Sequence, residues 1–449
     1  PVADLAQAKR SVVVGEPGIG KTELMKKLQA TLDQSDHLTK FIPLRSPDSI
    51  KEIDTFLSKR SRKTKALFLD ALDEVPRSDF LSVLKKIQEI SEKHPNLPIY
   101  VSSRWVFMEK YSNSFSTYRF ISIKPFTLEQ IKEYLSSGTC SAIDVDELFR
   151  RSMQFHGRVI IQIPRYLFLF EQYMEDKGAT VVQDISRNDL FEHFIYSKLK
   201  LEAENNEEIR ELEPVIKRLL EKLALTMEIH QAITITRDDL VTFFDDVKSD
   251  LKLMVLAQVG IDILLKNSVL QVSKSDTNQI EFENAEIQEY LAAKEITRLA
   301  EPRRATFNFA ADLTMNEIYP SWYNTLSFLV DMDPDMLGQL LDFSGIAGDT
   351  YRIIDESFLN FLSRINPTLT PSKVKKRLFV NVISYHNSRL QWMPGQLTSA
   401  FPSFYDPELE DFLKDIVQKA ETEDKTSTKY YVPIGNVAYA VAYLLRSKI

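Results

Sequence analysis

A glycine-rich loop between an apolar run and a helical pattern constrains the fold of this chain more than any other stretch. The apolar run 11–14 predicts a buried strand, and the apolar spacing of 23–28 predicts a helix. Between them the residues follow the pattern G-x-x-x-x-G-K-T, and they are Gly15, Glu16, Pro17, Gly18, Ile19, Gly20, Lys21 and Thr22. Glycines let the backbone turn so that successive N–H groups point at one anion, near the positive end of the following helix. The stretch therefore predicts a phosphate-binding loop.

A second motif supplies the carboxylates that such a loop needs. In a phosphate-binding loop of this kind, Lys21 reaches the β- and γ-phosphates of a bound nucleotide and the Thr22 hydroxyl holds Mg²⁺. Residues 65–69 predict a strand, and Asp70 at its carboxyl end is placed to hold the shell of the same metal. Asp73 and Glu74 follow within one turn, so up to three carboxylates face one metal and one γ-phosphate. ATP or ADP with Mg²⁺ is the predicted cofactor, and Asp73 and Glu74 are the candidate catalytic carboxylates.

Strands and helices alternate over residues 1–125. Further strands are predicted at 39–44, 98–103 and 118–123, with helices at 49–59 and 78–93. Such alternation predicts a doubly wound parallel sheet with its ligand at the carboxyl ends of the strands. Arg104, at the end of the 98–103 strand, is expected at the edge of this crevice, where it can sense the γ-phosphate. A plain surface arginine is the alternative.

Residues 126–225 predict a helical domain. Thr127 and Gln130 form a capping box, and apolar residues then recur at three- and four-residue spacing. Pro164 interrupts an apolar run, where it either seats the base of a nucleotide or simply starts a helix. The acidic segment 202–213 contains Asn205 and Asn206, which predict a loop.

Residues 226–300 predict a winged helix, because helices are followed by a hairpin and a last helix. The helix starts near Thr236, residues 264–272 lead into a strand, 275–278 form a turn, and 279–282 are the returning strand. The last helix, 286–293, carries acidic residues where a DNA reader would carry Arg or Lys. The remaining residues, 301–449, predict stacked helices that serve as a sensor or scaffold, with a simple helical cap as the alternative. The basic clusters 303–304 and 373–377 are expected to be solvated.

Composition limits the class of protein. The 56 basic and 64 acidic residues leave a net charge of −8, which argues against a general nucleic-acid-binding surface. The single Cys140 cannot form an internal disulfide, and no apolar run reaches the length of a membrane span. We therefore expect a cytoplasmic protein without a membrane segment. The start at Pro1 fits either removal of the initiator Met or a fragment of a longer chain.

Together these motifs resemble the NACHT branch of the STAND ATPases, and the chain looks NLR-like, of a bacterial defence type. The resemblance spans roughly residues 11–297, and it is carried by the phosphate loop, the acidic stretch 67–74, Arg104, Pro164 and the stretch 282–293. It implies a nucleotide switch in which ADP locks the winged helix against the ATPase domain and ATP with a trigger releases it to form a homo-oligomer. The resemblance also implies a trigger, a protein or a nucleic acid, that acts at the C-terminal region, and an effector domain outside this chain. Where this family has a His that touches the β-phosphate of ADP, this chain has Asn284, a neutral donor.

We therefore interpret the chain as a weak ATPase that works as a switch, with a role in innate immune or antiviral defence implied by the resemblance. Two other functions stay open at this point. One is an AAA+-like ATPase that remodels a partner by continuous hydrolysis. The other is a transcription regulator whose winged helix reads DNA, which salt-dependent binding to duplex DNA would favour.

Overall fold

The computed structural model describes residues 8–35, 37–136, 140, 143–156, 160–177, 185–205, 207–248, 265, 269–273, 277–343, 356–363, 365–367, 369–393 and 404–446. The chain divides into two compact units. The first comprises Pro1–Tyr134, Ile161–Lys177 and Leu190–Ala292, and the second comprises Leu135–Ile160, Gly178–Asp189 and Ala293–Ile449. The predicted boundaries at 125, 225 and 300 stay a prediction.

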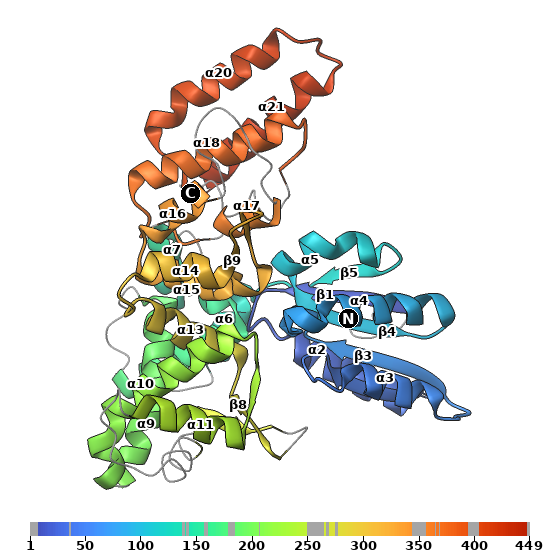
Figure 1. Cartoon of the computed structure of the whole chain (residues 1–449). Coiled ribbons are helices and arrows are strands. Elements are labelled where there is room, and N and C mark those ends of the chain that lie inside the picture. The colour runs from blue at the N-terminus through green and yellow to red at the C-terminus, as the bar shows by residue number, and fades with distance from the viewer. Residues whose placement is uncertain are drawn as a thin grey trace. The chain divides into compact units, whose positions relative to one another are not determined.

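A five-stranded parallel sheet, in the order β2-β3-β4-β1-β5, forms the start of the first unit (Figure 1). Its strands are β1 (Arg10–Gly15), β2 (His37–Pro43), β3 (Thr64–Asp70), β4 (Ile99–Arg104) and β5 (Arg119–Ser122). The helices between them are α2 (Lys21–Gln34), α3 (Ser49–Ser58), α4 (Arg77–Lys93) and α5 (Trp105–Tyr111), with short 3₁₀ turns η1 (Leu72–Glu74) and η2 (Ser112–Phe115). The predicted alternation of parallel strands and helices is confirmed.

Helices cover both faces of this sheet because side chains alternate along each strand. Val12 and Val14 of β1 pack in one apolar cluster with residues of α3, α4 and α5. Val13, between them, packs in the opposite cluster with Met25 and Leu28 of α2. Strands that are apolar on both faces are typical of parallel sheets covered by helices on each side.

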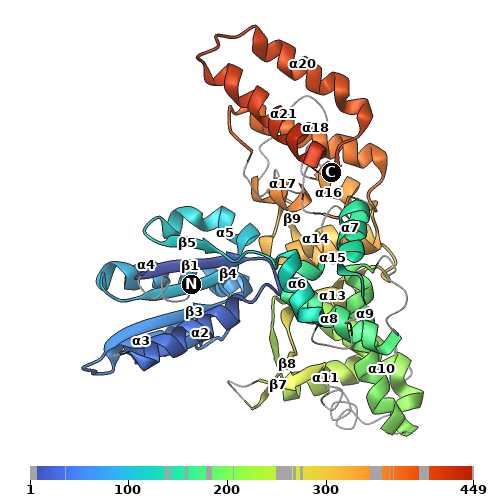
Figure 2. The same ribbon diagram turned by 180° about the vertical axis from the view of Figure 1, so that it is seen from behind.

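The first unit continues with helices and a small antiparallel sheet. Its helices are α6 (Leu128–Ser136), α8 (Pro164–Lys177), α9 (Arg187–Asn205), α10 (Glu207–Ile229), α11 (Arg237–Lys248) and α13 (Ala285–Ile296), of which α6, α9 and α13 each cross a unit boundary (Figure 2). The capping box is confirmed, since Thr127 N–H donates to Gln130 Oε1 (2.9 Å) and Gln130 N–H donates to Thr127 Oγ1 (3.3 Å). The small sheet has the order β6-β8-β7, with β6 (Thr234–Thr236), β7 (Leu270–Val272) and β8 (Gln279–Phe282).

The predicted hairpin is thus present as β7 and β8, and β6 joins it as a third strand that the sequence did not indicate. The first part of the predicted approach to the hairpin strand, residues 264 and 266–268, lies outside the described residues, as does the turn at 275–276. The predicted loop at 205–206 falls where α9 ends and α10 begins two residues later, and residue 206 is outside the described residues.

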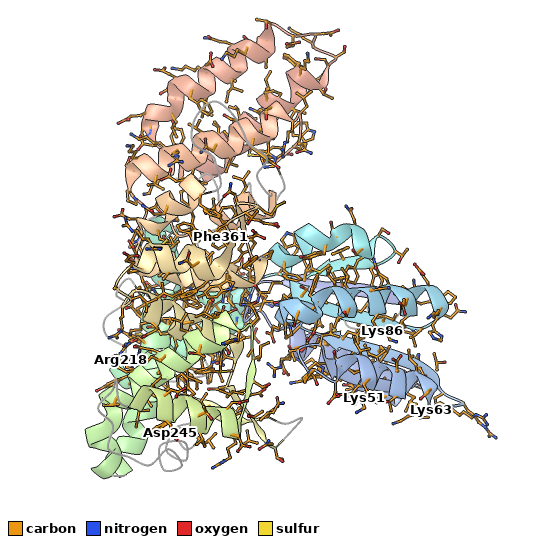
Figure 3. All side chains as sticks on the ribbon, viewed as in Figure 1. Lys51, Lys63, Lys86, Arg218, Asp245 and Phe361 are labelled. Carbon is orange, nitrogen blue, oxygen red and sulfur yellow. The ribbon has the colours of Figure 1, made fainter. Side chains whose placement is uncertain are left out.

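The second unit is mostly helical. Its elements are α7 (Val145–His156), η3 (Ile160–Gln162) at its boundary, α14 (Pro302–Ala310), β9 (Ala311–Asp312), β10 (Glu317–Ile318), η4 (Pro320–Trp322), α15 (Tyr323–Met332), α16 (Met336–Phe343), α17 (Glu356–Ser363), α18 (Ser372–Ser388), η6 (Pro407–Leu409), α20 (Glu410–Glu421) and α21 (Thr428–Arg446). Phe361, labelled in Figure 3, stacks on Tyr323 with ring centroids 4.9 Å apart. The apolar segments 321–329, 358–362, 374–383 and 409–417, from which the sequence predicts stacked helices, fall on α15, α17, α18 and α20, whereas α14, α16 and α21 lie outside those segments.

The basic clusters of this unit pair with carboxylates: Arg303 with Asp333, Arg304 with Glu301, Lys376 with Asp406, and Arg377 with Asp342. In the described part of the chain, no helix combines the length and apolar character needed to cross a membrane.

Candidate nucleotide site

The loop after β1 has the backbone conformation that a phosphate-binding loop requires. Gly18 and Gly20 have φ angles of 70° and 98°, in the left-handed region that disfavours other residues. Gly18 is needed for a second reason, because a Cβ added there would lie 2.6 Å from Cβ of Arg165. Gly20 directly precedes α2, so the loop ends at the amino terminus of a 14-residue helix, where backbone N–H groups favour an anion.

Lys21 lies folded back over this loop. Its Nζ donates to the carbonyl oxygens of Gly15 (3.1 Å) and Glu16 (3.0 Å). Burial lowers the pKa of Lys21, while the nearby charge of Asp73 acts in the opposite direction. An ammonium that has only backbone carbonyls as hydrogen-bond partners is suited to exchange them for the oxygens of a phosphate.

Thr22 and Asp70, the two residues that the sequence proposes as metal ligands, are hydrogen-bonded to each other. Thr22 Oγ1 donates to Asp70 Oδ2 at 2.9 Å, and Asp70 Oδ1 accepts from the Ser102 hydroxyl. The backbone N–H of Ala71 also donates to Ser102 Oγ (2.7 Å). The tip of β4, which lies between β1 and β3 in the sheet, thereby fixes Asp70.

The acidic stretch does not gather around one metal position. Among the described residues, no group of three or more His, Cys, Asp or Glu side chains is arranged to hold a metal ion. Asp73 and Glu74 bind arginines instead. Thr22 and Asp70 are therefore the residues that would hold Mg²⁺, with the nucleotide supplying further oxygen ligands.

Asp73 is bound by Arg104 in two ways. The backbone N–H of Arg104 donates to Asp73 Oδ1 (2.9 Å), and its Nε lies 2.9 Å from Asp73 Oδ2. The Nη1 atom of the same arginine lies 2.5 Å from Glu289 Oε1 on α13. Burial opposes the charge of Arg104, but Glu289 and Asp73 outweigh it and raise the pKa of the guanidinium. Arg104, at the end of β4, thus bridges two carboxylates, and its predicted role as a γ-phosphate sensor stays a prediction.

Glu74 is held in a parallel way by Arg45. Arg45 Nη1 lies 3.5 Å from Glu74 Oε2, and Arg45 Nη2 lies 3.3 Å from Glu281 Oε2 on β8. Burial raises the pKa of Glu74 to about 7, although Arg45 partly offsets this. Two arginines therefore link the acidic turn η1 to the segment 281–289, and we call Asp73–Arg104–Glu289 and Glu74–Arg45–Glu281 the arginine bridges.

Pro164 is the first residue of α8, and the start of that helix touches the phosphate loop. The backbone N–H of Arg165 donates to the Gly18 carbonyl at 3.3 Å. The guanidinium of Arg165 lies over the Phe194 ring, 5.3 Å from its centroid. Its Nε and Nη2 are buried and have no hydrogen-bond partner. Pro164 therefore fits the helix-start interpretation, in a helix whose first turn is at the loop.

The start of α13 reaches the same loop. Glu286 Oε1 accepts from the Tyr166 hydroxyl (2.8 Å), and its Oε2 would lie 3.3 Å from a Cβ on Gly18. Asn284, two residues earlier, caps α13, because its Oδ1 accepts from the backbone N–H of Ile287 at 3.1 Å. Asn284 Nδ2 is buried without a partner.

The buried donors that lack partners indicate what kind of ligand this site could hold. Buried polar groups normally have hydrogen-bond partners, so Nδ2 of Asn284 and the two nitrogens of Arg165 call for acceptors. The glycine loop provides a cradle that any Cβ at Gly18 would fill. Phosphate oxygens are acceptors of the required kind, and the residues present therefore fit a nucleotide with its metal.

Sequence reasoning found Lys21, Thr22, Asp70, Asp73, Glu74 and Arg104, and the structure brings these residues together. It missed four other residues of the site, namely Arg45, Arg165, Glu281 and Glu289. One available signal was that α13 carries acidic residues among apolar ones, so some carboxylates had to be buried and buried carboxylates need cations. For Arg165 the signal was its place directly after Pro164.

Comparison with known proteins adds little to this geometry. No family model matches the chain, and no curated protein matches it. Two solved structures of RuvB from Thermotoga maritima, one of a variant and one described as a Holliday junction branch migration motor, are similar over 61% of this chain and 85% of theirs. The identities are 15% and 14%, and the TM-scores are 0.26 and 0.24. Scores this low support no functional argument, so the P-loop NTPase-like α/β fold rests on the sheet order, the loop and the tip of β3.

Proposed function

We propose that this protein binds ATP or ADP with Mg²⁺ and works as a slowly hydrolysing nucleotide switch of the STAND type. The observation that carries the proposal is the bond between Thr22 and Asp70, which pairs the phosphate loop with the acidic strand tip. A hydroxyl and a carboxylate held together at this place suit Mg²⁺ with a nucleotide, and Mg²⁺ supplies neutralisation of phosphate charge when bound.

The proposed roles of the site residues follow from their positions. Lys21 and the N–H groups of the loop bind phosphates, Thr22 and Asp70 hold the metal, and Arg104 senses the terminal phosphate. Asp73 and Glu74 orient the attacking water in the hydrolysing state. In the geometry described here, both carboxylates are held by the arginine bridges, which supports slow turnover.

The switch is supported by what lies against the phosphate loop. Arg165 of α8 donates its backbone N–H to Gly18, and Glu286 of α13 would lie 3.3 Å from a Cβ at Gly18, so both helices lie against the loop. We propose that ADP retains this closed arrangement and that ATP with a trigger opens it, followed by homo-oligomerisation. The proposed parts are a P-loop domain (1–125), a helical domain (126–225), a winged helix (226–300) and a sensor region (301–449).

A DNA-reading winged helix is disfavoured by burial. Glu286, Gln288 and Glu289 of α13 are each about 5% exposed. Gln288 Nε2 donates to Glu228 Oε2 (3.1 Å), and the Tyr290 hydroxyl donates to Glu192 Oε2 (2.6 Å). A helix engaged in this way does not present a face to a DNA groove.

The test is a titration of the whole chain with ATP and with ADP, with and without Mg²⁺. Lys21→Ala should weaken binding by about 100-fold, because it removes charge-assisted hydrogen bonds to phosphate. Asp70→Ala should lose the Mg²⁺-dependent part of the affinity. Lys27→Ala, an exposed lysine on the same helix, is the matched control and should bind normally. Unaltered affinity in Lys21→Ala would refute the proposal.

Turnover and assembly separate the switch from a motor. A switch should hydrolyse ATP at or below about 1 s⁻¹, whereas sustained faster hydrolysis would favour an AAA+-like remodelling ATPase. Native mass spectrometry with ADP and then ATP should show a monomer and then a larger species. For the defence role, which rests on the resemblance alone, bacteria that express the full-length protein should survive phage challenge better than bacteria with Lys21→Ala.

A further inference from the structure

Arg104 is placed to respond to the phosphate end of a nucleotide, and a carboxylate from a remote segment holds it. Arg104 lies beside Gly15 in the register of β4 and β1, at the point where the phosphate loop begins. Burial has the largest effect on the pKa of Lys21, and Asp73 has the second largest. The charge of Arg104 comes third, and it lowers this pKa. The guanidinium is therefore close to the residue expected to bind the β- and γ-phosphates.

Glu289 accepts a hydrogen bond from this guanidinium and so takes one of its donors. The side chains of Arg104 and Glu289 are only 17% and 7% exposed, and their charged atoms are 2.5 Å apart. Asp73 binds Nε of Arg104, so the two carboxylates together take up two of its donor nitrogens. An additional anionic oxygen that approaches Nη1 meets the negative charge of Glu289 on the same nitrogen.

The charge around the loop makes this competition depend on the number of phosphate groups. The charges of Asp73, Glu74 and Glu286 already act on Lys21 and raise its pKa, and Glu289 adds a further carboxylate at Arg104. A third phosphate group next to Arg104 would meet the like charge of Glu289 in a poorly hydrated place. A nucleoside diphosphate lacks that group and leaves the pair undisturbed.

We infer that Glu289 makes this site prefer a nucleoside diphosphate over a triphosphate, because Glu289 occupies the part of Arg104 that a third phosphate group would contact. The inference rests on the proposed function, and it identifies Glu289 as the residue that sets the preference between the two nucleotides. Arg104 pairs either with Glu289 or with the terminal phosphate, so α13 stays bound with the diphosphate and is released with the triphosphate. The other arginine bridge, through Arg45 and Glu281, holds the same segment without touching Arg104.

The decisive measurement is the ratio of ATP to ADP affinity in the full chain, by titration with ADP and with a non-hydrolysable ATP analogue. Glu289→Gln keeps the shape and an acceptor oxygen but removes the charge. It should raise the ratio in favour of the triphosphate by about tenfold, the effect of one pK unit of differential interaction. An unchanged ratio in a variant that still binds ADP would overturn the inference.

Glu281→Gln is the matched control, because it weakens the Arg45 bridge and loosens the same segment. Because the loosened segment is the one held with the diphosphate, this variant should also raise the ratio, but by clearly less than Glu289→Gln, since Arg104 keeps its Glu289 partner. If Glu281→Gln shifts the ratio as much as Glu289→Gln, then general loosening explains the effect and Glu289 has no role in discrimination.

Hydrogen exchange gives a second readout that does not depend on affinity. Amides of α13 should exchange faster with the ATP analogue than with ADP in the unsubstituted protein, and equally fast with both in Glu289→Gln. The same exchange with both nucleotides in the unsubstituted protein would also overturn the inference. A protein that binds neither nucleotide would refute the proposed function itself, whereas nucleotide binding with no effect of Glu289→Gln would refute only this inference.

Discussion

The candidate nucleotide site of the first unit, which we call the crevice after its predicted place, and the helices of residues 302–446 bury polar groups of different kinds. The crevice buries Asp70, Glu281, Glu286 and Glu289, and three of these four are held by an arginine or by Thr22. Among the described residues of 302–446, no Asp, Glu, Lys or Arg is buried to that degree, and the buried polar side chains are neutral ones such as Thr325, Asn436 and His386.

This difference indicates what each region is built for. Burying a charge costs free energy even when it is paired, so a cluster of buried charges marks a place where charge is used. The helices of 302–446 instead fill their interior with aromatic and aliphatic side chains, such as the stacked rings of Tyr323, Phe358 and Phe361. Their stability should depend on packing, and that of the crevice on electrostatics.

The largest expected effect is on packing in the C-terminal helices. Phe379 on α18 is fully buried and contacts Tyr405, with ring centroids 5.7 Å apart. Phe379→Ala should lower the free energy of unfolding of this region by about 3–5 kcal/mol, because it removes buried apolar surface and leaves a cavity. Urea unfolding measures the loss, and nucleotide affinity should stay unchanged.

Lys373→Ala, at an exposed position of the same helix, is the control and should change stability by less than about 0.5 kcal/mol. If Phe379→Ala abolished nucleotide binding at a temperature where the first unit is folded, the separation of the two regions into packing and charge would fail.

A second prediction is that the two regions respond to pH in opposite directions. Burial lowers the pKa of His386 to about 4, and both of its ring nitrogens lack partners, so the unfolded state binds more protons between pH 4 and 6.5. Stability of the C-terminal helices should therefore fall as pH decreases through this range. Glu74, with its pKa raised to about 7, binds its proton more tightly when folded, so the crevice should lose stability as pH increases from about 4.5 to 7.

Each slope should reach at most about 1.4 kcal/mol per pH unit, the value for one proton. Hydrogen exchange of α18 and of β3, measured across this pH range and corrected for intrinsic exchange rates, reports the two regions separately. His386→Leu should remove only the first trend and Glu74→Gln only the second. Parallel trends in both regions would contradict the assignment.

The smallest expected effect concerns Asn284, whose Oδ1 caps α13 and whose Nδ2 is a buried donor without a partner. Asn284→Ala should lower the free energy of unfolding of the first unit by about 1 kcal/mol through loss of the α13 cap. It should also weaken ADP binding by about fivefold, because the buried Nδ2 donor is lost. Thermal unfolding and ADP titration measure the two effects.

Asn284→Asp separates these roles, since Asp is as good a helix cap as Asn but has no amide donor. It should keep the stability and lose the ADP affinity. If Asn284→Asp binds ADP as the unsubstituted protein does, residue 284 is only the cap of α13.

Local patterns were sufficient to predict several elements. The central strands β1, β3 and β4 were recognisable from apolar runs that are buried on both faces, and α6 was recognisable from Thr127 and Gln130, whose reciprocal bonds join residues three apart. The helix α21 was not predicted, and it contains Pro433 and Gly435, two residue types that disfavour a helix interior. Only the fold shows why a glycine is there: a Cβ at Gly435 would lie 2.0 Å from a ring atom of Trp392.

By itself, the sequence determined the phosphate loop, the strand that carries Asp70 and the parallel α/β order. These depend on residues close in the chain, whose spacing fixes backbone conformation and the burial of each face. Tertiary structure alone decided which carboxylates the crevice arginines bind. Arg104 and Glu289 are 185 positions apart, and Arg45 and Glu281 are 236 apart, so no local pattern relates them. The fold brings them together because a buried charge must find an opposite charge wherever the packing of α13 places one.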